Sequence, residues 1–336
     1  MALPSSAVTR LDLSLTFSEF SLAANRRGFI GLRALPAVGV AQDSAKFLKI
    51  PVEQLLKPVE DLKRSDKAGY KRDDFEFTED SYATDDYGAE EVLGDRSLKR
   101  YSSLIRAERI HAMRAIYRVQ QAYEQACANA VFDTATWTGE ALTTNVDIPW
   151  TTAASAKPIE DIDGAIDQVT ANIGRRPNGI IIPYKAAKAM MRTAQITDLV
   201  KYSGHTDPTQ LVASAVAILQ SLFDFEIILI PDGVKNTGKE GGSAAFTRHW
   251  DPTMCMVCNV AQDNGDLEDP EPGIGRTIMW EEENASIPGA GEAELPIIMD
   301  EYREEHRRGS ILRARADFQA KIIYPEAGHL LTGVTA

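Results

Sequence analysis

Two cysteines, Cys255 and Cys258, form the arrangement with the clearest chemical potential in this sequence, a CxxC pair. A zinc site would need two more ligands at set spacing, and the remaining cysteine, Cys127, lies far away in the sequence without a paired partner. A thioredoxin-type redox pair sits where a strand meets a helix. Residues 254–260 instead read as a strand, which would put the two thiols on opposite faces. We therefore expect the cysteines to be structural.

The other candidate sites are weaker. The histidines form no HxxxH or HxH pair. Gly273 and Gly275 lack the third glycine and the strand–turn–helix context of a dinucleotide loop, and residues 263–266 match a calcium loop in composition but not in spacing. Adjacent carboxylates such as Asp300 and Glu301 are common in an acidic chain and carry little information about catalysis. We expect no catalytic residue, no cofactor and no metal site, and hence a protein that is not an enzyme.

Composition and charge narrow the class of protein. With 336 residues the chain has room for one large domain or two small ones, and its 44% hydrophobic and 25% charged residues are typical of a globular protein. No run approaches the ~18 apolar residues of a transmembrane helix, and the N-terminus lacks the layout of a signal peptide. The few cysteines favour a reducing compartment. The net charge of −13 argues against tight nucleic-acid binding by the whole chain, although a local basic face could still make contact.

The longest element that the sequence predicts is a helix over residues 96–132. No Gly or Pro occurs between Gly94 and Gly139, so this run is much longer than an average helix of ~11–12 residues. Apolar residues at helical spacing form two adjacent stripes, which predict a broad buried face. The stripes are Ile105, Ala112, Ile116, Val119, Tyr123, Ala126 and Ala130, and beside them Ile110, Met113, Tyr117, Cys127 and Val131. The remainder is basic, with only Glu108 and Glu124 against it, and we interpret it as a solvated face rather than a coiled-coil seam.

Residues 1–44 read as an arm rather than a domain. Phe17, Phe20, Phe29 and Ile30 are scattered among small and polar residues without a sustained period. A stretch of this kind cannot bury its apolar residues on itself. We expect it to lie across its own fold or across a neighbouring chain.

Residues 45–94 read as a projecting ribbon. Residues 46–51 predict a short strand, and residues 73–82 alternate, with Phe75 and Phe77 on one face. The tip between these limbs is basic and the returning limb is acidic. Because isolated two-stranded ribbons are marginal in water, we expect a partner chain to stabilise this one. The alternative is a mobile surface loop.

An alternating α/β region follows the long helix. Helices are predicted over residues 158–173, 185–193, 195–202 and 209–223, and strands at 179–182, 226–230, 254–260 and 276–280. Residues 231–250 are rich in Gly and Lys and predict a turn or loop. Long antiparallel strands are predicted at residues 295–307 and 310–324, with one dry face, and the tail after them is weakly patterned.

The order of these parts resembles that of the major capsid proteins of tailed bacteriophages, which have the Hong Kong phage or Johnson fold. The return limb of that family's extended loop and its spine helix are similar to DDFEFTEDSYATDDYGAEEVL followed by RSLKRYSSL. The strand–turn–strand of its axial domain is similar to EIILIPD, the Gly-rich turn and TRHWDPTMCMVCNV. The resemblance covers nearly the whole chain, and its specificity lies in the order of elements rather than in single residues.

The resemblance implies an α+β fold with five parts. These are an N-terminal arm (1–44), an extended β-loop (45–94), the spine helix of a peripheral domain (95–133), an axial domain (134–260) and C-terminal strands that are mostly peripheral (261–336). The implied contacts with neighbouring subunits are Phe17, Phe20, Phe29, Lys63, Arg64, Lys67, Phe75, Phe77 and Tyr82. The implied core residues of the spine helix are Ile105, Ile116, Val119 and Tyr123.

The resemblance also implies a structural protein that assembles as hexamers and pentamers into an icosahedral shell around double-stranded DNA. It would be located in the virion, after assembly in the host cytoplasm. Implied partners are separate scaffolding, portal and decoration proteins, with weak non-specific contact to DNA and none to a membrane. Lys63 and Lys67 lie near the loop tip, but no asparagine partner can be assigned, so we expect no covalent crosslink.

Two alternatives remain open from the sequence. The shell protein of a cellular nanocompartment of the encapsulin type shares this fold and would hold a cargo enzyme instead of nucleic acid. An α/β enzyme with an appended oligomerisation ribbon would instead have a concave pocket lined by titratable groups with shifted pKa values.

Overall fold

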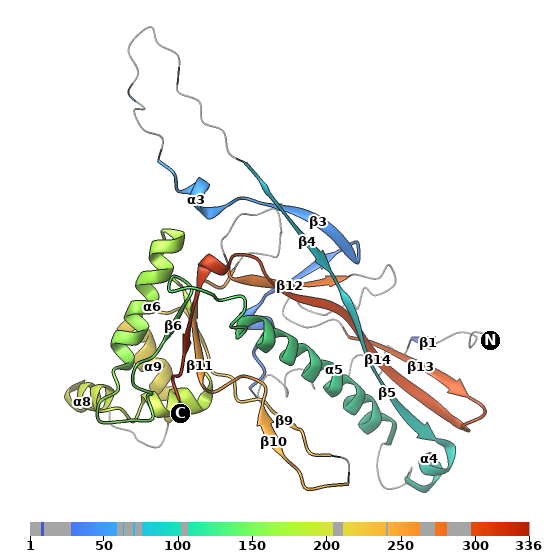
Figure 1. The fold of residues 1–336 in the computed structure, drawn as a ribbon. Coiled ribbons are helices and arrows are strands. Elements are labelled where there is room, and N and C mark those ends of the chain that lie inside the picture. Colours follow the sequence, from blue (N-terminus) through green and yellow to red (C-terminus); the bar gives the residue numbers. More distant parts are fainter. Residues whose placement is uncertain are drawn as a thin grey trace.

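Two β-sheets, joined by one long helix, make up the body of the molecule (Figure 1). The computed structural model describes residues 8–9, 28–58, 63, 70, 76–101, 107–203, 211–239, 241–262, 273–280 and 297–335. None of the helices in these ranges is both long and apolar enough to cross a membrane.

Strand β14 (Gly309–Ile322) organises the first sheet. It pairs antiparallel with β13 (Ile298–Glu304), β5 (Asp85–Gly94) and β12 (Gly275–Trp280). β12 also pairs in parallel with β2 (Ala37–Val40), and β1 (Val8–Thr9) pairs with β13. Along β14 the buried side chains of Leu312, Ala314, Ala316 and Phe318 alternate with polar ones, as the sequence predicts for a strand with one dry face.

Helix α5 (Ala107–Val131) covers this dry face and runs along β5 and β14 toward the second sheet (Figure 1). The ring of Tyr123 packs edge-on against Phe318, with centroids 5.0 Å apart, and Tyr87 of β5 stacks on Phe318 at 4.3 Å. Ile116 and Val119 are buried in the same core. The helix therefore fixes the position of the first sheet through a continuous apolar contact.

The second sheet contains five short strands in the order β6 (Thr143–Asn145), β15 (Gly328–Thr332), β11 (Met254–Cys258), β7 (Gly179–Ile181) and β8 (Ile227–Leu229). The helices that follow or separate these strands are α6 (Pro158–Ile173), α7 (Tyr184–Met190), α8 (Ala194–Ser203) and α9 (Leu211–Phe223). One face of the sheet packs with α7 and α9 around the buried Trp150. The other face joins the core that contains α5 and the first sheet, so the two sheets share one apolar interior.

The bounds of α6 follow from its sequence. Pro158 occupies the first turn, where its missing N–H has no intrahelical role, and Glu160 and Asp161 place negative charge at the positive end of the helix dipole. Gly174 ends the helix with φ 69°, a left-handed conformation that glycine adopts without a Cβ penalty.

Two antiparallel ribbons project from this body on opposite sides (Figure 1). One pairs β3 (Ser44–Lys49) with β4 (Thr78–Ala83), and the other pairs β9 (Val234–Asn236) with β10 (Phe246–Arg248). The remaining elements are short: α2 (Gly31–Ala34), α3 (Val52–Leu55), α4 (Asp95–Tyr101) and the 3₁₀ turn η1 (Pro325–Ala327).

The structure differs from the sequence prediction in several places. The helix expected over residues 96–132 is described as α4 and α5, and residues 102–106 between them lie outside the described part. Ile110 was assigned to a buried stripe but is 49% exposed, and Glu124 was assigned to the solvated face but is 1% exposed. The reason for the second difference is that distant backbone and indole N–H groups bind the Glu124 carboxylate. The weakly patterned tail contains β15, an interior strand of the second sheet, and the Gly-rich interval contains β9 and β10.

Candidate assembly surfaces

The cysteines occupy positions that suit packing rather than reaction. Cys258 faces the core shared with α5, whereas Cys255 faces the core of α7 and α9, so the two thiols point to opposite sides of β11 as predicted. Burial raises the pKa of the Cys258 thiol to about 12 and also raises the pKa of Cys255. Among the described residues, no three His, Cys, Asp or Glu side chains are grouped so that they could hold a metal ion.

The outer face of the ribbon β3–β4 carries large exposed apolar side chains among polar ones. Leu48 is 56% exposed, and Phe77, which immediately precedes β4, is 52% exposed. Beside them Lys46 and Glu79 form an ion pair at 2.9 Å whose side chains are both mostly exposed. A two-stranded ribbon that exposes large apolar side chains has little to stabilise it in an isolated subunit.

The inner face of the same ribbon packs against its own chain. Phe47 of β3 lies 6.4 Å from the ring of Tyr82 of β4, and the ammonium of Lys321 lies 5.8 Å from the centre of the Phe47 ring. Tyr82 is 8% exposed. The root of the ribbon is therefore fixed to β14.

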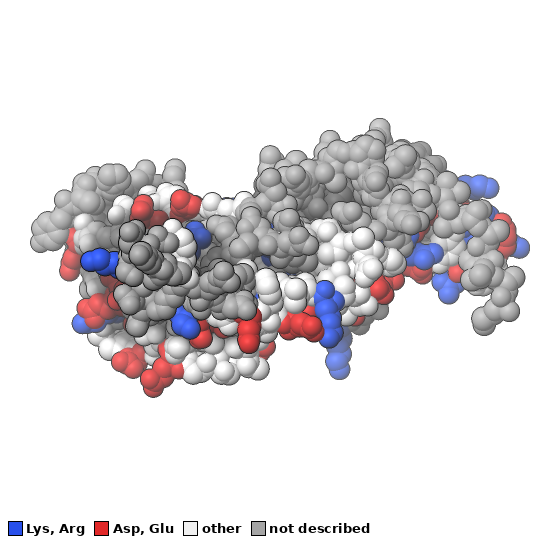
Figure 2. Space-filling view, turned by 90° about the horizontal axis from the view of Figure 1, so that it is seen from above, with Lys and Arg blue, Asp and Glu red and all other residues white. Residues whose placement is uncertain are grey.

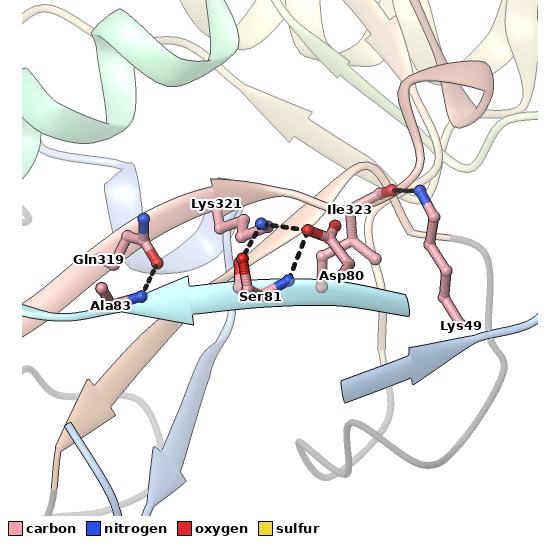
Figure 3. A network of polar contacts seen from close by, with 7 residues as sticks. All are labelled: Lys49, Asp80, Ser81, Ala83, Gln319, Lys321 and Ile323. Carbon is pink, nitrogen blue, oxygen red and sulfur yellow. Dashed lines mark hydrogen bonds and ion pairs between the residues drawn. The ribbon is translucent and has the colours of Figure 1, made fainter. Parts of the chain in front are cut away.

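A polar network reinforces this root (Figure 3). Lys321 of β14 donates to Oδ1 of Asp80 at 2.6 Å and also to the carbonyl of Ser81, while the Ser81 N–H donates to Asp80 at 2.7 Å. Burial alone would raise the pKa of Asp80, but the hydrogen bonds from Lys321 and Ser81 and the nearby positive charges lower it overall. Asp80 is thus held in the ionised form that pairs with Lys321.

Two further bonds join the ribbon to the end of β14 (Figure 3). The N–H of Ala83 donates to Oε1 of Gln319 at 3.1 Å, and Lys49 of β3 donates to the carbonyl of Ile323 at 3.2 Å. Beyond Ala83 the single residue Thr84 separates β4 from β5, and both its N–H and its hydroxyl donate to the carbonyl of Asp43. These contacts mark the point at which the chain changes from pairing with β3 to pairing with β14.

A buried carboxylate joins β5 to α5. Glu91 is 7% exposed, and its Oε1 lies 2.7 Å from Nη1 of Arg118 and 3.3 Å from Nε of Arg114. His111 on the same helix lies 3.5 Å from Oε2. The negative charge of Glu91 on β5 is therefore balanced by the arginines of α5, which lets the acidic strand pack against the basic helix.

The structure places the predicted contact residues in different environments. Phe77 and Lys63 are exposed, whereas Phe29 and Tyr82 are buried in their own chain and so are not available to a neighbour. Burial of Phe29 follows from its stacking on Tyr117 of α5. The predicted contact residues Phe17, Phe20, Arg64, Lys67 and Phe75, and the predicted core residue Ile105, lie outside the described residues.

The ribbon β9–β10 carries exposed apolar residues that the sequence reading missed. Phe246 is 71% exposed, and Val234 on the partner strand is 44% exposed. The only local signal for an exposed surface was a phenylalanine in a run of small residues. Neither strand is long enough to show a hydrophobic period. Lys235 ties this ribbon to the body through Gln125 of α5 at 2.5 Å.

Charge is mixed on the face shown in Figure 2. Described Lys, Arg, Asp and Glu side chains are interspersed there, and no continuous basic surface forms among them. A surface of this kind does not favour tight binding of a phosphate backbone.

Comparison with known proteins gives one curated relative and several related structures. No family model matches the sequence. The major capsid protein of Burkholderia phage BcepMu is 24% identical over 184 residues, which are 54% of this chain and 52% of that protein. The chain thus spans about half the length of the curated relative that it matches.

The related structures match over most of their length. A phage-related protein from Bordetella bronchiseptica RB50 has a TM-score of 0.71 at 20% identity, over 98% of this chain and 99% of that chain. The mature capsid of bacteriophage PhiM1 has a TM-score of 0.53 at 12% identity, over 88% and 85%. The encapsulin complex of Synechococcus elongatus PCC 7942 also has a TM-score of 0.53, at 10% identity, over 90% and 86%. At these identities the likeness establishes the fold.

Proposed function

We propose that this chain, which has the Hong Kong phage-type capsid fold, is the major subunit of an icosahedral phage shell that encloses double-stranded DNA. The observation that carries the proposal beyond the fold is the ribbon β3–β4. It is anchored at its root by its own chain but exposes Leu48 and Phe77 on its outer face. Large exposed apolar side chains of this kind are stabilised when a neighbouring copy covers them.

The proposed contacts follow from the part of the ribbon that leaves the body. Phe77 and Lys63 are exposed and would lie against a neighbouring subunit. We extend the same role to Phe17, Phe20, Arg64, Lys67 and Phe75, on the basis of the sequence resemblance alone. Hexamers and pentamers are the assemblies that this fold would form, with residues 134–260 as the axial domain and α5 with the first sheet as the peripheral domain.

The charge of the chain suits a container for DNA. A net charge of −13 limits neutralisation of phosphates, so packaged DNA would be held weakly and could leave. Scaffolding, portal and decoration proteins would be separate partners, and the assembled shell, formed in the host cytoplasm, would be part of the virion.

One alternative has support from a specific observation. Because the fold is also that of an encapsulin, the same subunit could enclose a cargo protein in a cell. The two proposals differ in what the particle holds. Particles purified from cells that carry the whole phage or prophage should protect double-stranded DNA from nuclease, whereas particles that contain an enzyme and no protected DNA would support the nanocompartment.

A further inference from the structure

The later part of the N-terminal arm, around α2, is held by two adjacent residues of α5, Tyr123 and Glu124. Glu124 is 1% exposed, and its two carboxylate oxygens accept from the N–H groups of Ile30 at 2.9 Å and Gly31 at 2.8 Å. These residues begin α2, which has no side-chain cap of its own. A Cβ on Gly31 would lie 2.9 Å from Oε2 of Glu124, so the close approach requires glycine here.

The same carboxylate also binds the segment that leads into the second sheet. The indole N–H of Trp250, 1% exposed, donates to Oε1 of Glu124 at 2.6 Å. Trp250 lies between β10 and β11, and its ring packs edge-on against Phe132 just after α5, at 5.1 Å. Glu124 of α5 thus joins the start of α2 to the segment before β11, and these two segments together supply three N–H groups to one buried charge.

The other end of α2 is held in a matching way. The hydroxyl of Thr277 in β12 donates to the carbonyl of Leu35 at 2.9 Å and lies 2.7 Å from the hydroxyl of Tyr123. Since the single Thr277 proton goes to Leu35, Tyr123 donates to Thr277. Neighbouring residues of α5 therefore fix both ends of α2.

Residues just before α2 are also confined. Phe29 stacks on Tyr117 at 5.9 Å and meets the edge of His249 at 5.5 Å. A Cβ on Gly233 would lie 2.8 Å from the Phe29 ring, so the base of the ribbon β9–β10 leaves room for that ring only because it has glycine there. The path of the chain is therefore determined up to Gly28.

Burial of Glu124 is not explained by stability alone. Burial raises the pKa of this carboxyl, so the charged form has a cost, and an apolar residue would fill the core without it. What a carboxylate adds is a fixed geometry, because it holds three N–H groups from two separate segments in one arrangement.

We propose that Glu124 and Trp250 are positioning residues that lock the start of α2 to α5 and to the segment that leads into β11. The lock gives every copy the same chain position and direction at Gly28, which is the fixed starting point that the preceding part of the arm needs in order to meet the same site on each neighbour. This purpose rests on the proposed function, whereas the lock itself is a property of the single chain.

The test compares two variants of the lock with a matched control. Glu124→Gln replaces one acceptor oxygen with an NH₂ group that opposes a donor, and Trp250→Phe removes one donor but keeps the carboxylate. The control is Trp150→Phe, because Trp150 is equally buried and its indole N–H also donates to a carboxylate, that of Asp161 of α6 at 2.8 Å. Trp150 belongs to the core of α7 and α9, whereas α2 packs in the other core.

Hydrogen exchange of the unassembled full chain is the first measurement, since it does not depend on shell formation. The lock predicts that the amides of residues 30–35 exchange on the order of tenfold faster in Trp250→Phe and Glu124→Gln than in the control. Equal exchange in Trp250→Phe and Trp150→Phe would overturn it, even if Glu124→Gln fails to fold.

Assembly is the second measurement. If the wild-type chain forms shells, the lock predicts lower yield or mixed sizes for Trp250→Phe and normal shells for Trp150→Phe. Normal shells from a Trp250→Phe chain with accelerated exchange would refute the purpose of the lock. A wild-type chain that forms no shells would count against the proposed function alone.

Discussion

The ammonium of Lys321 lies 2.6 Å from the carboxylate of Asp80 and joins the long strand β14 to the ribbon β3–β4. Both side chains are mostly buried, with 17% and 25% of their surface exposed. This pair separates the fixed root of the ribbon from the part that projects.

Replacement of Lys321 by methionine should loosen the root without removing its packing. Lys321→Met keeps most of the aliphatic stem against Phe47 but leaves Asp80 without its cation, so we expect the free energy of unfolding to fall by about 1–2 kcal/mol. The control is Lys46→Met, which breaks an ion pair between exposed side chains and should change it by less than about 0.5 kcal/mol. Urea unfolding of the unassembled subunit measures both, and equal effects would contradict the assigned role of Lys321.

The same pair predicts a pH dependence. Because the folded pKa of Asp80 is below its ordinary value of 3.8, its stabilising contribution is complete above that value and is lost as the pH falls below it, through the folded pKa. The difference in unfolding free energy between wild type and Lys321→Met should therefore shrink as the pH falls below about 4. A difference that grows over this range would show that ionised Asp80 does not stabilise the fold.

Phe77→Ala tests whether the outer face of the ribbon is an interface. The unassembled subunit should keep its stability to within about 0.5 kcal/mol, because Phe77 is exposed there. Assembly yield and the heat stability of particles should both decrease, because a large aromatic contact is lost in every copy. If both quantities are unchanged, Phe77 does not contribute to contact between subunits.

The ion cluster of Glu91, Arg114 and Arg118 should lose more stability when its cations are removed than when its anion is removed. Joint replacement of Arg114 and Arg118 by alanine leaves the Glu91 charge buried without compensation and should cost about 2–4 kcal/mol. Glu91→Gln leaves two partly exposed guanidinium groups that water can solvate, so it should cost only about 1 kcal/mol. Adding Glu91→Gln to the double variant should restore most of the loss. Thermal unfolding of the double variant, of Glu91→Gln and of the triple variant measures these changes in stability. A triple variant less stable than the double variant would contradict the prediction.

Elements whose ends and faces are determined by residues within the element itself were predicted correctly. Helix α6 spans Pro158–Ile173, the predicted range, because its proline, its first-turn acids and its final glycine all lie in the local sequence. The opposite orientation of Cys255 and Cys258 followed from strand geometry alone. The fold class inferred from the order of elements is confirmed by the structural likeness to a phage capsid protein.

Elements that depend on distant partners were missed. Strand β15 (Gly328–Thr332) is covered on both faces, so it shows no alternation, and its interior position depends on β6 and β11. Residues 85–94 were predicted as part of the acidic limb of a projecting ribbon, whereas β5 pairs with β14 in the first sheet. The cations opposite Glu90 and Glu91 come from β14 and α5, far away in the sequence.

Among the predicted contact residues, local sequence was again sufficient for some and insufficient for others. The exposure of Phe77 could be predicted, because the ribbon around it has too few apolar residues to form a core. The burial of Phe29 could not be foreseen, because it needs Tyr117, His249 and the space above Gly233, which lie 88 to 220 residues away along the chain. Glu124 was assigned to the solvent for the same reason, since nothing near it in sequence supplies the three N–H groups.

Electron microscopy of the chain expressed alone, with sizing at increasing protein concentration, tests the central claim most directly. A shell subunit should give closed particles, tubes or ring-shaped capsomers, with the ribbon β3–β4 of one copy resting on its neighbour. A monodisperse monomer at every concentration, with the outer face of the ribbon still exposed to solvent, would contradict the account.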